Sequence, residues 1–285
     1  MKRIAAAFER RRRSRELALI PYLTAGDPSP ELTPGLVWAL EEAGADLVEL
    51  GVPHSDPLAD GSTNQRAAAR ALAQGVTLAG VLDMAERIRT RSQIPLVLFS
   101  YYNPILRMGL EEFARRAAAA GADGAVVTDL PAEEAGELRA ALDAHGLALV
   151  PLLAPTSGAQ RMGKILALAR GFVYYVSRTG VTGARTDLAA DLRADLERVR
   201  AGCSVPLVVG FGISRPEHLR ALAGAADGVV IGSALVERVE KAGTARAVDE
   251  AAAFLRTLAE VRAAGRGGES GPGGAGDARQ SRRQL

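Results

Sequence analysis

The sequence contains few of the residues on which metal, disulfide and nucleic-acid chemistry depend. Its 285 residues include one cysteine, Cys203, which excludes an internal disulfide and a metal site built from several cysteines. The three histidines do not recur at metal-ligand spacing, so we expect no metal site. Aromatic residues make up only 4% and the formal net charge is +2, which does not indicate a surface for binding nucleic acid.

Long apolar runs are also missing. No uninterrupted stretch approaches the roughly 18 apolar residues of a membrane-spanning helix, and the first residues lack the apolar centre of a signal peptide. The one dense basic cluster, four arginines at 10–13, lies in a segment with helical spacing. We interpret this cluster as a solvated helix face rather than a nucleic-acid patch. We therefore expect a cytoplasmic protein.

What is present is an alternation of apolar strands and helical segments in an ordinary globular composition, 48% apolar and 24% charged. Strands are expected to begin near Leu17, Asp46, Pro95, Gly124, Leu147, Phe172, Val205 and Asp227. Helices are expected over residues 1–15, 34–43, 62–91 (room for two), 110–120, 133–144, 159–170, 188–200 and 216–223.

Eight such units predict a closed (β/α)8 TIM barrel over residues 1–262, with the amino-terminal helix across its bottom. An open doubly wound sheet is the structural alternative, but the first strand is not followed by a G-x-G-x-x-G sequence. Residues 263–285 are almost devoid of apolar side chains, and we expect a disordered tail there.

An internal echo supports the repeated unit. Three helices are followed by Ala-Gly-Ala and an aspartate before the next strand, at Asp46, Asp123 and Asp227, with one further alanine, Ala226, in the third copy. We expect each glycine to end its helix in a left-handed conformation, which other residues resist.

Glu49 interrupts an apolar run, and Asp60 follows eleven positions later on a loop rich in proline and glycine. A carboxylate inside an apolar strand is costly to bury unless it is paired, hydrogen-bonded or protonated. Two carboxylates in such unlike surroundings can divide acid and base roles, because one is pushed toward its neutral form. A salt-bridged strand glutamate and a turn-forming aspartate explain the same residues, and this stretch alone leaves both interpretations open.

The last three strand ends carry glycine. They read S-R-T-G-V-T-G (177–183), G-F-G-I-S (210–214) and G-S (232–233). In a barrel these loops meet at one face, where backbone N–H groups and the positive end of the helix after Ser233 can surround an anion. Turn glycines explain each loop singly, whereas three loops in succession favour a phosphate site.

Nine motifs give the chain a resemblance to the α subunits of tryptophan synthase over roughly residues 2–262. They are P-Y-L-T-A-G-D-P (21–28), V-E-L-G-V-P (48–53), S-D-P-L-A-D-G (55–61), Y-Y-N-P-I (101–105), D-L-P (129–131), A-P-T-S (154–157), G-F-V-Y-Y-V-S-R-T-G-V-T-G (171–183), G-F-G-I-S (210–214) and I-G-S-A (231–234).

The resemblance implies an enzyme that cleaves indole-3-glycerol phosphate into indole and glyceraldehyde 3-phosphate. In this retro-aldol reaction the leaving carbon, indole C3, must be protonated, and a carboxylate near indole N1–H must stabilise positive charge. By the resemblance Glu49 takes the acid–base role and Asp60 the role at N1–H. We expect a raised pKa for the buried Glu49, and a charged Asp60 on a loop that faces N–H donors.

The resemblance assigns further roles. The indole slot and the loop that closes over it are implied at Tyr22, Phe99, Tyr101, Val126, Leu152, Tyr174 and Thr182. Phosphate binding is implied at Gly183, Phe211, Gly212, Gly232 and Ser233. In the family a β subunit carries pyridoxal phosphate and receives indole through a tunnel, and we expect no cofactor in this chain. An α2β2 heterotetramer is implied, with partner contacts at Asp56, Pro57, Asn103, Pro104, Asp129 and Pro131.

The chain departs from the family pattern beside the implied catalytic residues. His54, Ser62 and Asn64 stand where phenylalanine, proline and isoleucine are usual, so this loop is more polar and lacks proline's fixed φ. A stand-alone lyase of specialised metabolism is therefore an alternative. A non-catalytic barrel that regulates a β-type partner is another, although Glu49 and Asp60 are both kept. A different phosphate-handling barrel would normally carry a catalytic lysine or cysteine at a strand end.

Overall fold

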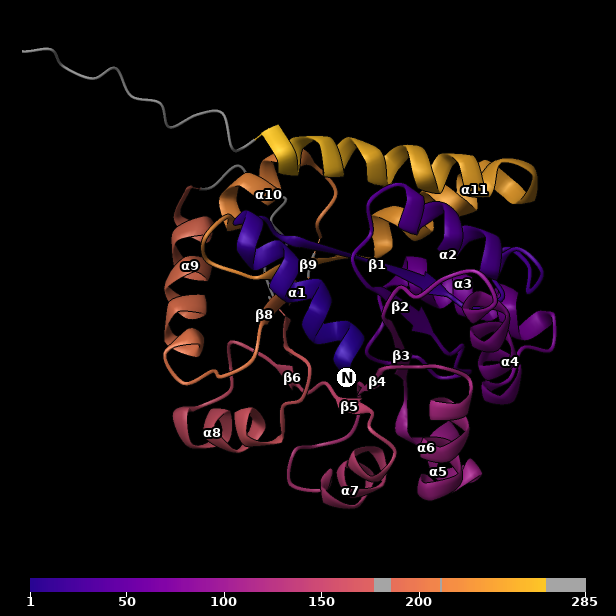
Figure 1. Ribbon diagram of the computed structural model, residues 1–285, viewed down its shortest axis with the longest axis horizontal. Helices are drawn as coiled ribbons and strands as arrows, with labels where there is room; N and C mark the ends of the chain where they lie inside the picture. The colour runs from indigo at the N-terminus through magenta and orange to yellow at the C-terminus, as the bar shows by residue number, and fades with distance from the viewer. Residues whose placement is uncertain (177–185, 211, 265–285) are drawn as a thin grey trace, which may run out of the picture.

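The computed structural model describes residues 1–176, 186–210 and 212–264, with the backbone alone described at 186–191 and 263–264. Within these ranges helices surround a ring of parallel strands (Figure 1). The strands are β1 (Ala18–Thr24), β2 (Val48–Gly51), β3 (Leu96–Ser100), β4 (Gly124–Val127), β5 (Ala148–Leu149), β6 (Leu152–Leu153), β7 (Val173–Val176), β8 (Leu207–Gly210) and β9 (Gly228–Ile231). The helices are α1 (Lys2–Ser14), α2 (Thr33–Glu42), α3 (Ser62–Ala73), α4 (Leu78–Arg89), α5 (Tyr102–Met108), α6 (Leu110–Ala119), α7 (Gly136–Ala144), α8 (Ala159–Leu168), α9 (Thr186–Arg200), α10 (Pro216–Leu222) and α11 (Ser233–Ala264).

The sheet closes through one broken strand. Its order is β5-β4-β3-β2-β1-β9-β8-β7-β6, and the two end members, β5 and β6, are consecutive pieces separated by Val150 and Pro151. β5 pairs with β4 and β6 pairs with β7, so the broken strand bridges both sides of the ring. Pro151 has no N–H to donate, which explains the interruption, while its carbonyl accepts from Tyr174 N–H at 3.1 Å. The (β/α)8 prediction is confirmed, and the break in its fifth strand was not predicted.

Helix α5 is a second difference, because no helix was expected between the third strand and residue 110. The carboxylate of Asp129, from the loop after β4, accepts the backbone N–H of Tyr102 at 2.7 Å and satisfies a donor at the helix start. Pro104 lies in the first turn, where its missing N–H costs nothing. At the other end of the chain α11 runs to Ala264, two residues past the expected boundary, and the rest of the expected tail lies outside the described residues.

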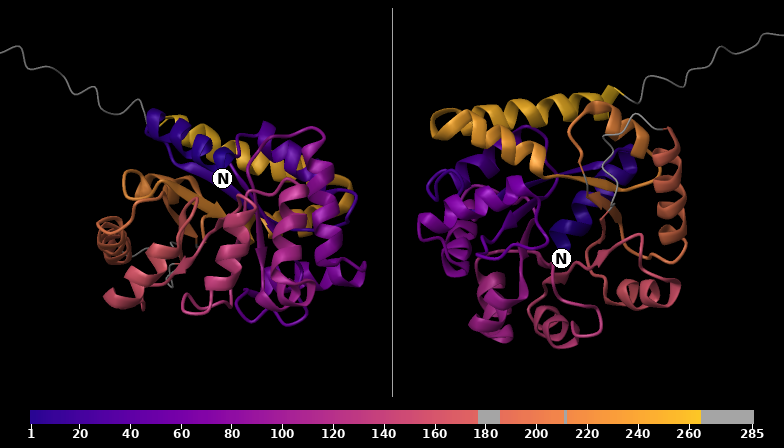
Figure 2. Two further views of the ribbon diagram at one scale, coloured as in Figure 1. Left: turned by 60° about the horizontal axis from the view of Figure 1, so that its bottom comes forward. Right: turned by 180° about the vertical axis from the view of Figure 1, so that it is seen from behind.

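Helix α1 lies across the bottom of the barrel, as predicted (Figures 1 and 2). Its Ile4 and Phe8 are buried in the same cluster as the inward-facing side chains of the strands, and the Phe8 and Phe172 ring centroids are 5.6 Å apart. A second, larger cluster fills the space between the strands and the outer helices. Of the helices in the described ranges, none has the length and apolar character to cross a membrane.

Three aspartates fix the register of neighbouring strands at the barrel bottom. Each carboxylate accepts the backbone N–H of a leucine on the strand beside its own, and its backbone N–H donates to that same leucine's carbonyl. The carboxylate-to-nitrogen distances are 3.1 Å for Asp46 and Leu19, 3.0 Å for Asp123 and Leu96, and 2.8 Å for Asp227 and Leu207. The preceding glycines, at 44, 121 and 224, have φ of 104°, 81° and 76°, as the echo predicted.

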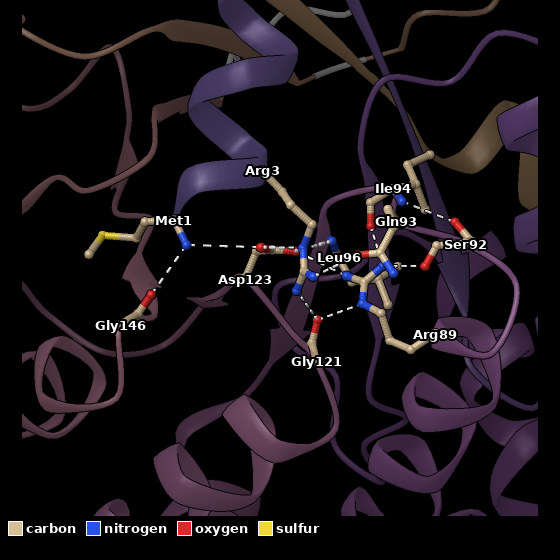
Figure 3. A network of polar contacts seen from close by, with 10 residues as sticks. All are labelled: Met1, Arg3, Arg89, Ser92, Gln93, Ile94, Leu96, Gly121, Asp123 and Gly146. Carbon is tan, nitrogen blue, oxygen red and sulfur yellow. Dashed lines mark hydrogen bonds and ion pairs between the residues drawn. The ribbon is translucent and has the colours of Figure 1, made fainter.

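Arginine side chains form ion pairs with these carboxylates. Figure 3 shows Asp123 bound by Arg3 of α1, whose Nε lies 2.9 Å away, and by Arg89 of α4, whose terminal nitrogen lies 3.0 Å away. Asp46 is bound in the same way by Arg11 and Arg262. The interpretation of residues 10–13 as a solvated face is therefore wrong for Arg11, which is 19% exposed and anchors α1 to the barrel.

Replacing Asp123 with asparagine should lower the free energy of unfolding by about 3–5 kcal/mol, because Arg89, only 12% exposed, would lose its counter-charge. Glu112→Gln is the matched control, since it breaks an exposed pair with Arg115 and should cost less than about 1 kcal/mol. Urea unfolding followed by circular dichroism measures both. Equal, small losses would show that Asp123 does not carry this role.

Candidate active site

Glu49 lies on β2 with its side chain in the barrel interior. Strand residues alternate between faces, so Val48 and Leu50 contact the helix layer while Leu47 and Glu49 point inward. Glu49 is fully buried, and neither carboxylate oxygen has a hydrogen-bond partner among the described residues. This desolvation raises the pKa of Glu49 to about 8, and the raised pKa expected from the sequence is confirmed.

Asp60 lies on the loop between β2 and α3, where a tyrosine holds it. The Tyr101 hydroxyl donates to Asp60 Oδ2 at 3.0 Å and accepts the backbone N–H of Ala59 at 2.9 Å. Burial raises the pKa of Asp60, while hydrogen bonds from Tyr101 and Asn64 and the nearby His54 oppose the rise. That Asp60 is charged at neutral pH stays a prediction.

The helix that follows Asp60 is anchored on two sides. Arg70 of α3 donates to Asp27 at 2.7 Å and to Glu240 at 2.6 Å, and Arg66 donates to Glu240 at 2.7 Å. These contacts connect α3 with the loop after β1 and with α11. The start of α3, and with it the Asp60 loop, is therefore held against two neighbouring elements of the barrel.

Both carboxylates face the same two tyrosines. The pKa values of Tyr22 and Tyr174 are raised by burial and also by the negative charges of Glu49 and Asp60. Tyr22 is the register partner of Glu49 across β1 and β2, and Tyr174 enters from β7. The fold thus brings the two residues singled out in the sequence near the same pair of tyrosines, Glu49 from inside the barrel and Asp60 from the loop after β2.

The residues implied for the indole slot divide into two groups. Five belong to the cluster in the barrel interior: Tyr22, Phe99, Val126, Leu152 and Tyr174. Tyr22 and Phe99 meet edge to face with ring centroids 5.3 Å apart. The sixth, Tyr101, lies outside this cluster and is bound to the Asp60 loop, a contact that the sequence did not indicate. Thr182 lies outside the described residues.

The residues implied for phosphate binding are described only in part. Gly232 and Ser233 lie where β9 meets α11, and Ser233 is exposed at the helix start, whose N–H groups and dipole attract anions. Gly212 follows the neighbouring strand β8 and has a φ of 62°, which favours glycine. Gly183 and Phe211 lie outside the described residues, so the structure does not test them.

The residues implied for partner contact come from three neighbouring segments. Asp56, Asn103 and Asp129 are exposed, and Pro57, Pro104 and Pro131 are half-buried. Asn103 and Pro104 belong to α5 rather than to a loop. Sequence reasoning missed two apolar residues in the same segments, Leu58 and Leu106, which are 84% and 55% exposed. Their signal was an apolar side chain beside proline and polar residues, in segments that none of the expected helices covers.

A cavity of about 400 Å³ lies at the break between β5 and β6. Of the described residues implied for the slot, Leu152 alone lines it, and the lining continues to Asp129 and Pro131 of the expected partner surface. The cavity therefore lies beside the Glu49 site rather than around it. The described residues contain no cluster of three or more histidine, cysteine, aspartate and glutamate side chains able to hold a metal ion.

Comparisons with known proteins agree on one family. The family model described as "Tryptophan synthase alpha chain" matches residues 8–263. A tryptophan synthase alpha chain of Geobacter sulfurreducens is 51% identical over 92% of this chain and 99% of its own length. The crystal structure of the alpha subunit from Legionella pneumophila superposes with a TM-score of 0.84 at 39% identity, covering 91% of this chain and 98% of that one. A structure from the Pyrococcus furiosus tryptophan synthase α2β2 complex gives 0.80 at 39% identity over 86% and 98% of the two chains.

Glu49→Gln should stabilise the folded chain in alkaline solution. The pKa of Glu49 is about 8 when folded against an ordinary 4.5, so folding favours the protonated form. The contribution of Glu49 to the free energy of unfolding is then highest below about pH 4.5. It falls as the pH rises through 8, by up to about 5 kcal/mol. The uncharged glutamine escapes this loss. We expect a higher melting temperature than wild type at pH 8.5 and a difference that closes toward pH 4.5.

Thermal unfolding at a series of pH values measures this effect. The exposed Glu86→Gln on α4 is the matched control and should leave the melting temperature within a degree or two of wild type, about the effect of a surface substitution. A gap between Glu49→Gln and wild type that does not vary with pH would contradict the raised pKa.

Proposed function

The chain belongs to the tryptophan synthase alpha chain family, and we propose that it cleaves indole-3-glycerol phosphate to indole and glyceraldehyde 3-phosphate. The observation that carries this proposal is the fully buried, unpartnered carboxyl group of Glu49, which shares two facing tyrosines with Asp60. A group with a pKa of about 8 is mostly protonated at neutral pH and can act as a general acid.

Glu49 supplies the proton that indole C3 needs before the carbon–carbon bond breaks. As a carboxylate it then takes up the proton of the glycerol C3′ hydroxyl, which becomes the aldehyde of glyceraldehyde 3-phosphate. The Asp60 carboxylate accepts a hydrogen bond from indole N1–H and stabilises the positive charge of the protonated ring. The Tyr101 hydroxyl keeps Asp60 in this place.

The other residues bind and enclose the substrate in this proposal. Tyr22, Phe99 and Tyr174, with Val126 and Leu152, supply apolar surface for the indole ring. Gly212, Gly232 and Ser233, together with Gly183 and Phe211, bind the phosphate through backbone N–H groups and the Ser233 hydroxyl. Thr182 contacts Asp60 from the loop that closes over the site.

The chain works with a β subunit in an α2β2 assembly. The Pyrococcus furiosus relative is described as an α2β2 complex, and the exposed Leu58 and Leu106 give this chain apolar surface among the residues assigned to that contact. Pyridoxal phosphate belongs to the β subunit, and the α reaction needs no cofactor. The assembly acts in the cytoplasm.

Glu49→Gln should reduce indole release by about 10²-fold or more, because the amide can neither give nor take the proton at C3. Substrate affinity should change little, since Glu49 does not contact the phosphate. Indole release from indole-3-glycerol phosphate, with and without a β subunit, and calorimetric titration measure the two effects. The exposed Glu86→Gln is the control and should turn over normally. Near-normal turnover in Glu49→Gln would rule out the assignment, and a wild-type chain inactive in both conditions would rule out the function.

Leu58→Asp should weaken association with the β subunit without lowering the activity of the isolated chain. Leu58 is 84% exposed, so its replacement costs little stability, but it places a charge in a contact that must exclude water. Sedimentation or calorimetry with the purified β subunit gives the affinity. Leu106→Asp is expected to behave alike. The same change at the exposed Thr90 serves as the control, because Thr90 ends α4 at the opposite end of the barrel from the loops that follow the strands. Unchanged affinity in both leucine variants would remove this surface from the interface.

A further inference from the structure

The loop that carries Asp60 departs from the family pattern at two residues that converge on its side chain. Asn64, in the first turn of α3, opposes the rise that burial causes in the pKa of Asp60. The His54 imidazole stacks on the Tyr101 ring with centroids 4.7 Å apart and planes 28° apart, and the Tyr101 hydroxyl binds Asp60 at 3.0 Å. Two separate polar substitutions therefore meet at one carboxylate.

The side chain of Asn64 is energetically unfavourable at its position. Its Oδ1 is buried and has no hydrogen-bond partner among the described residues, so an apolar side chain of equal size would be better for stability. An amide donates through its nitrogen, and only this donor can lower the pKa of the Asp60 carboxyl group, as Asn64 does. Any benefit of Asn64 comes from this N–H donor, because its buried and unpartnered Oδ1 destabilises the folded chain.

His54 is fixed from two directions. Its Nδ1 accepts the backbone N–H of Asp56 at 3.1 Å, which sets the ring orientation, and its face covers Tyr101. Tyr101 in turn connects the backbone N–H of Ala59 with the Asp60 carboxylate through a single hydroxyl. A ring that holds Tyr101 in place therefore also holds the donor to Asp60.

We propose that Asn64 and His54 are positioning residues for Asp60, Asn64 through its amide donor and His54 through the ring that it stacks on Tyr101. Together they hold the Asp60 side chain charged and oriented toward the barrel interior. This inference rests on the proposed function, in which Asp60 acts as a carboxylate at indole N1–H. It adds two residues to the site that the family pattern does not contain.

The groups that face Asp60 settle the direction of its pH dependence. In the described part of the chain they are His54 on its own loop, Tyr22 on β1, Tyr101 after β3 and Tyr174 on β7. Burial raises the pKa of all three tyrosines, so they stay neutral through the working range. Loss of a donor leaves burial less opposed, and the pKa of Asp60 rises further.

The first test replaces the Asn64 donor. Asn64→Leu, of similar size, should move the acid limb of the kcat/KM profile for indole-3-glycerol phosphate cleavage upward by about one pH unit. Gln65→Leu is the matched control, because Gln65 donates at 2.9 Å to the backbone carbonyl of Asp60 and not to its carboxylate. The control should leave the acid limb where it is in wild type. An acid limb unchanged in Asn64→Leu, or moved equally in both variants, overturns the role of Asn64.

The second test separates the His54 ring from its charge. His54→Ala should lower kcat about 10-fold with little change in KM, and His54→Phe, which keeps a flat ring over Tyr101, should restore most of the loss. A purely structural role would lower the melting temperature and leave kcat of the folded fraction unchanged. Failure of phenylalanine to restore kcat overturns the stacking role. Because wild type is assayed beside the variants, a wild-type chain without activity refutes the proposed function, whereas active wild type with unmoved variants refutes this inference.

Discussion

Burial of the Glu49 carboxyl group without a hydrogen-bond partner is the constraint on which the rest of the site depends. A proton is the cheapest way to keep such a group in an apolar interior, and the barrel supplies that interior on every side. The closed ring of strands, the bottom helix and the aromatic residues above Glu49 all serve to exclude water from it. A less complete barrel would leave an ordinary, charged glutamate.

Asp60 represents the opposite solution to the same problem. Hydrogen-bond donors rather than apolar walls surround its carboxylate, and they oppose the rise that burial causes in its pKa. Two carboxyl groups that face the same tyrosines are thus given different chemistry by their immediate neighbours. The anchoring of α3 by Arg70 matters for this reason, because it fixes the position of the helix that follows Asp60.

The sequence predicted the parts of the structure that depend on local patterns. The alternation of strands and helices, the left-handed glycines before Asp46, Asp123 and Asp227, and the burial of Glu49 all follow from short stretches of chain. What it did not reveal depends on contacts between distant segments. The helix start at Tyr102 is capped by Asp129, and Tyr101 is bound to Asp60. Neither contact can be recognised from the sequence of one of its two segments alone.

The three register-fixing aspartates also bear on how such a barrel can be assembled and altered. Counting β5 and β6 as one strand, they precede the second, fourth and eighth strands, whereas no aspartate precedes the sixth. Three of the four two-strand units therefore carry an alignment signal between their members. Exchange of whole units between related barrels preserves that signal, whereas exchange of single strands separates an aspartate from its leucine. The barrel is in this respect modular, and the boundaries between its units lie at the end of the barrel opposite to the candidate active site.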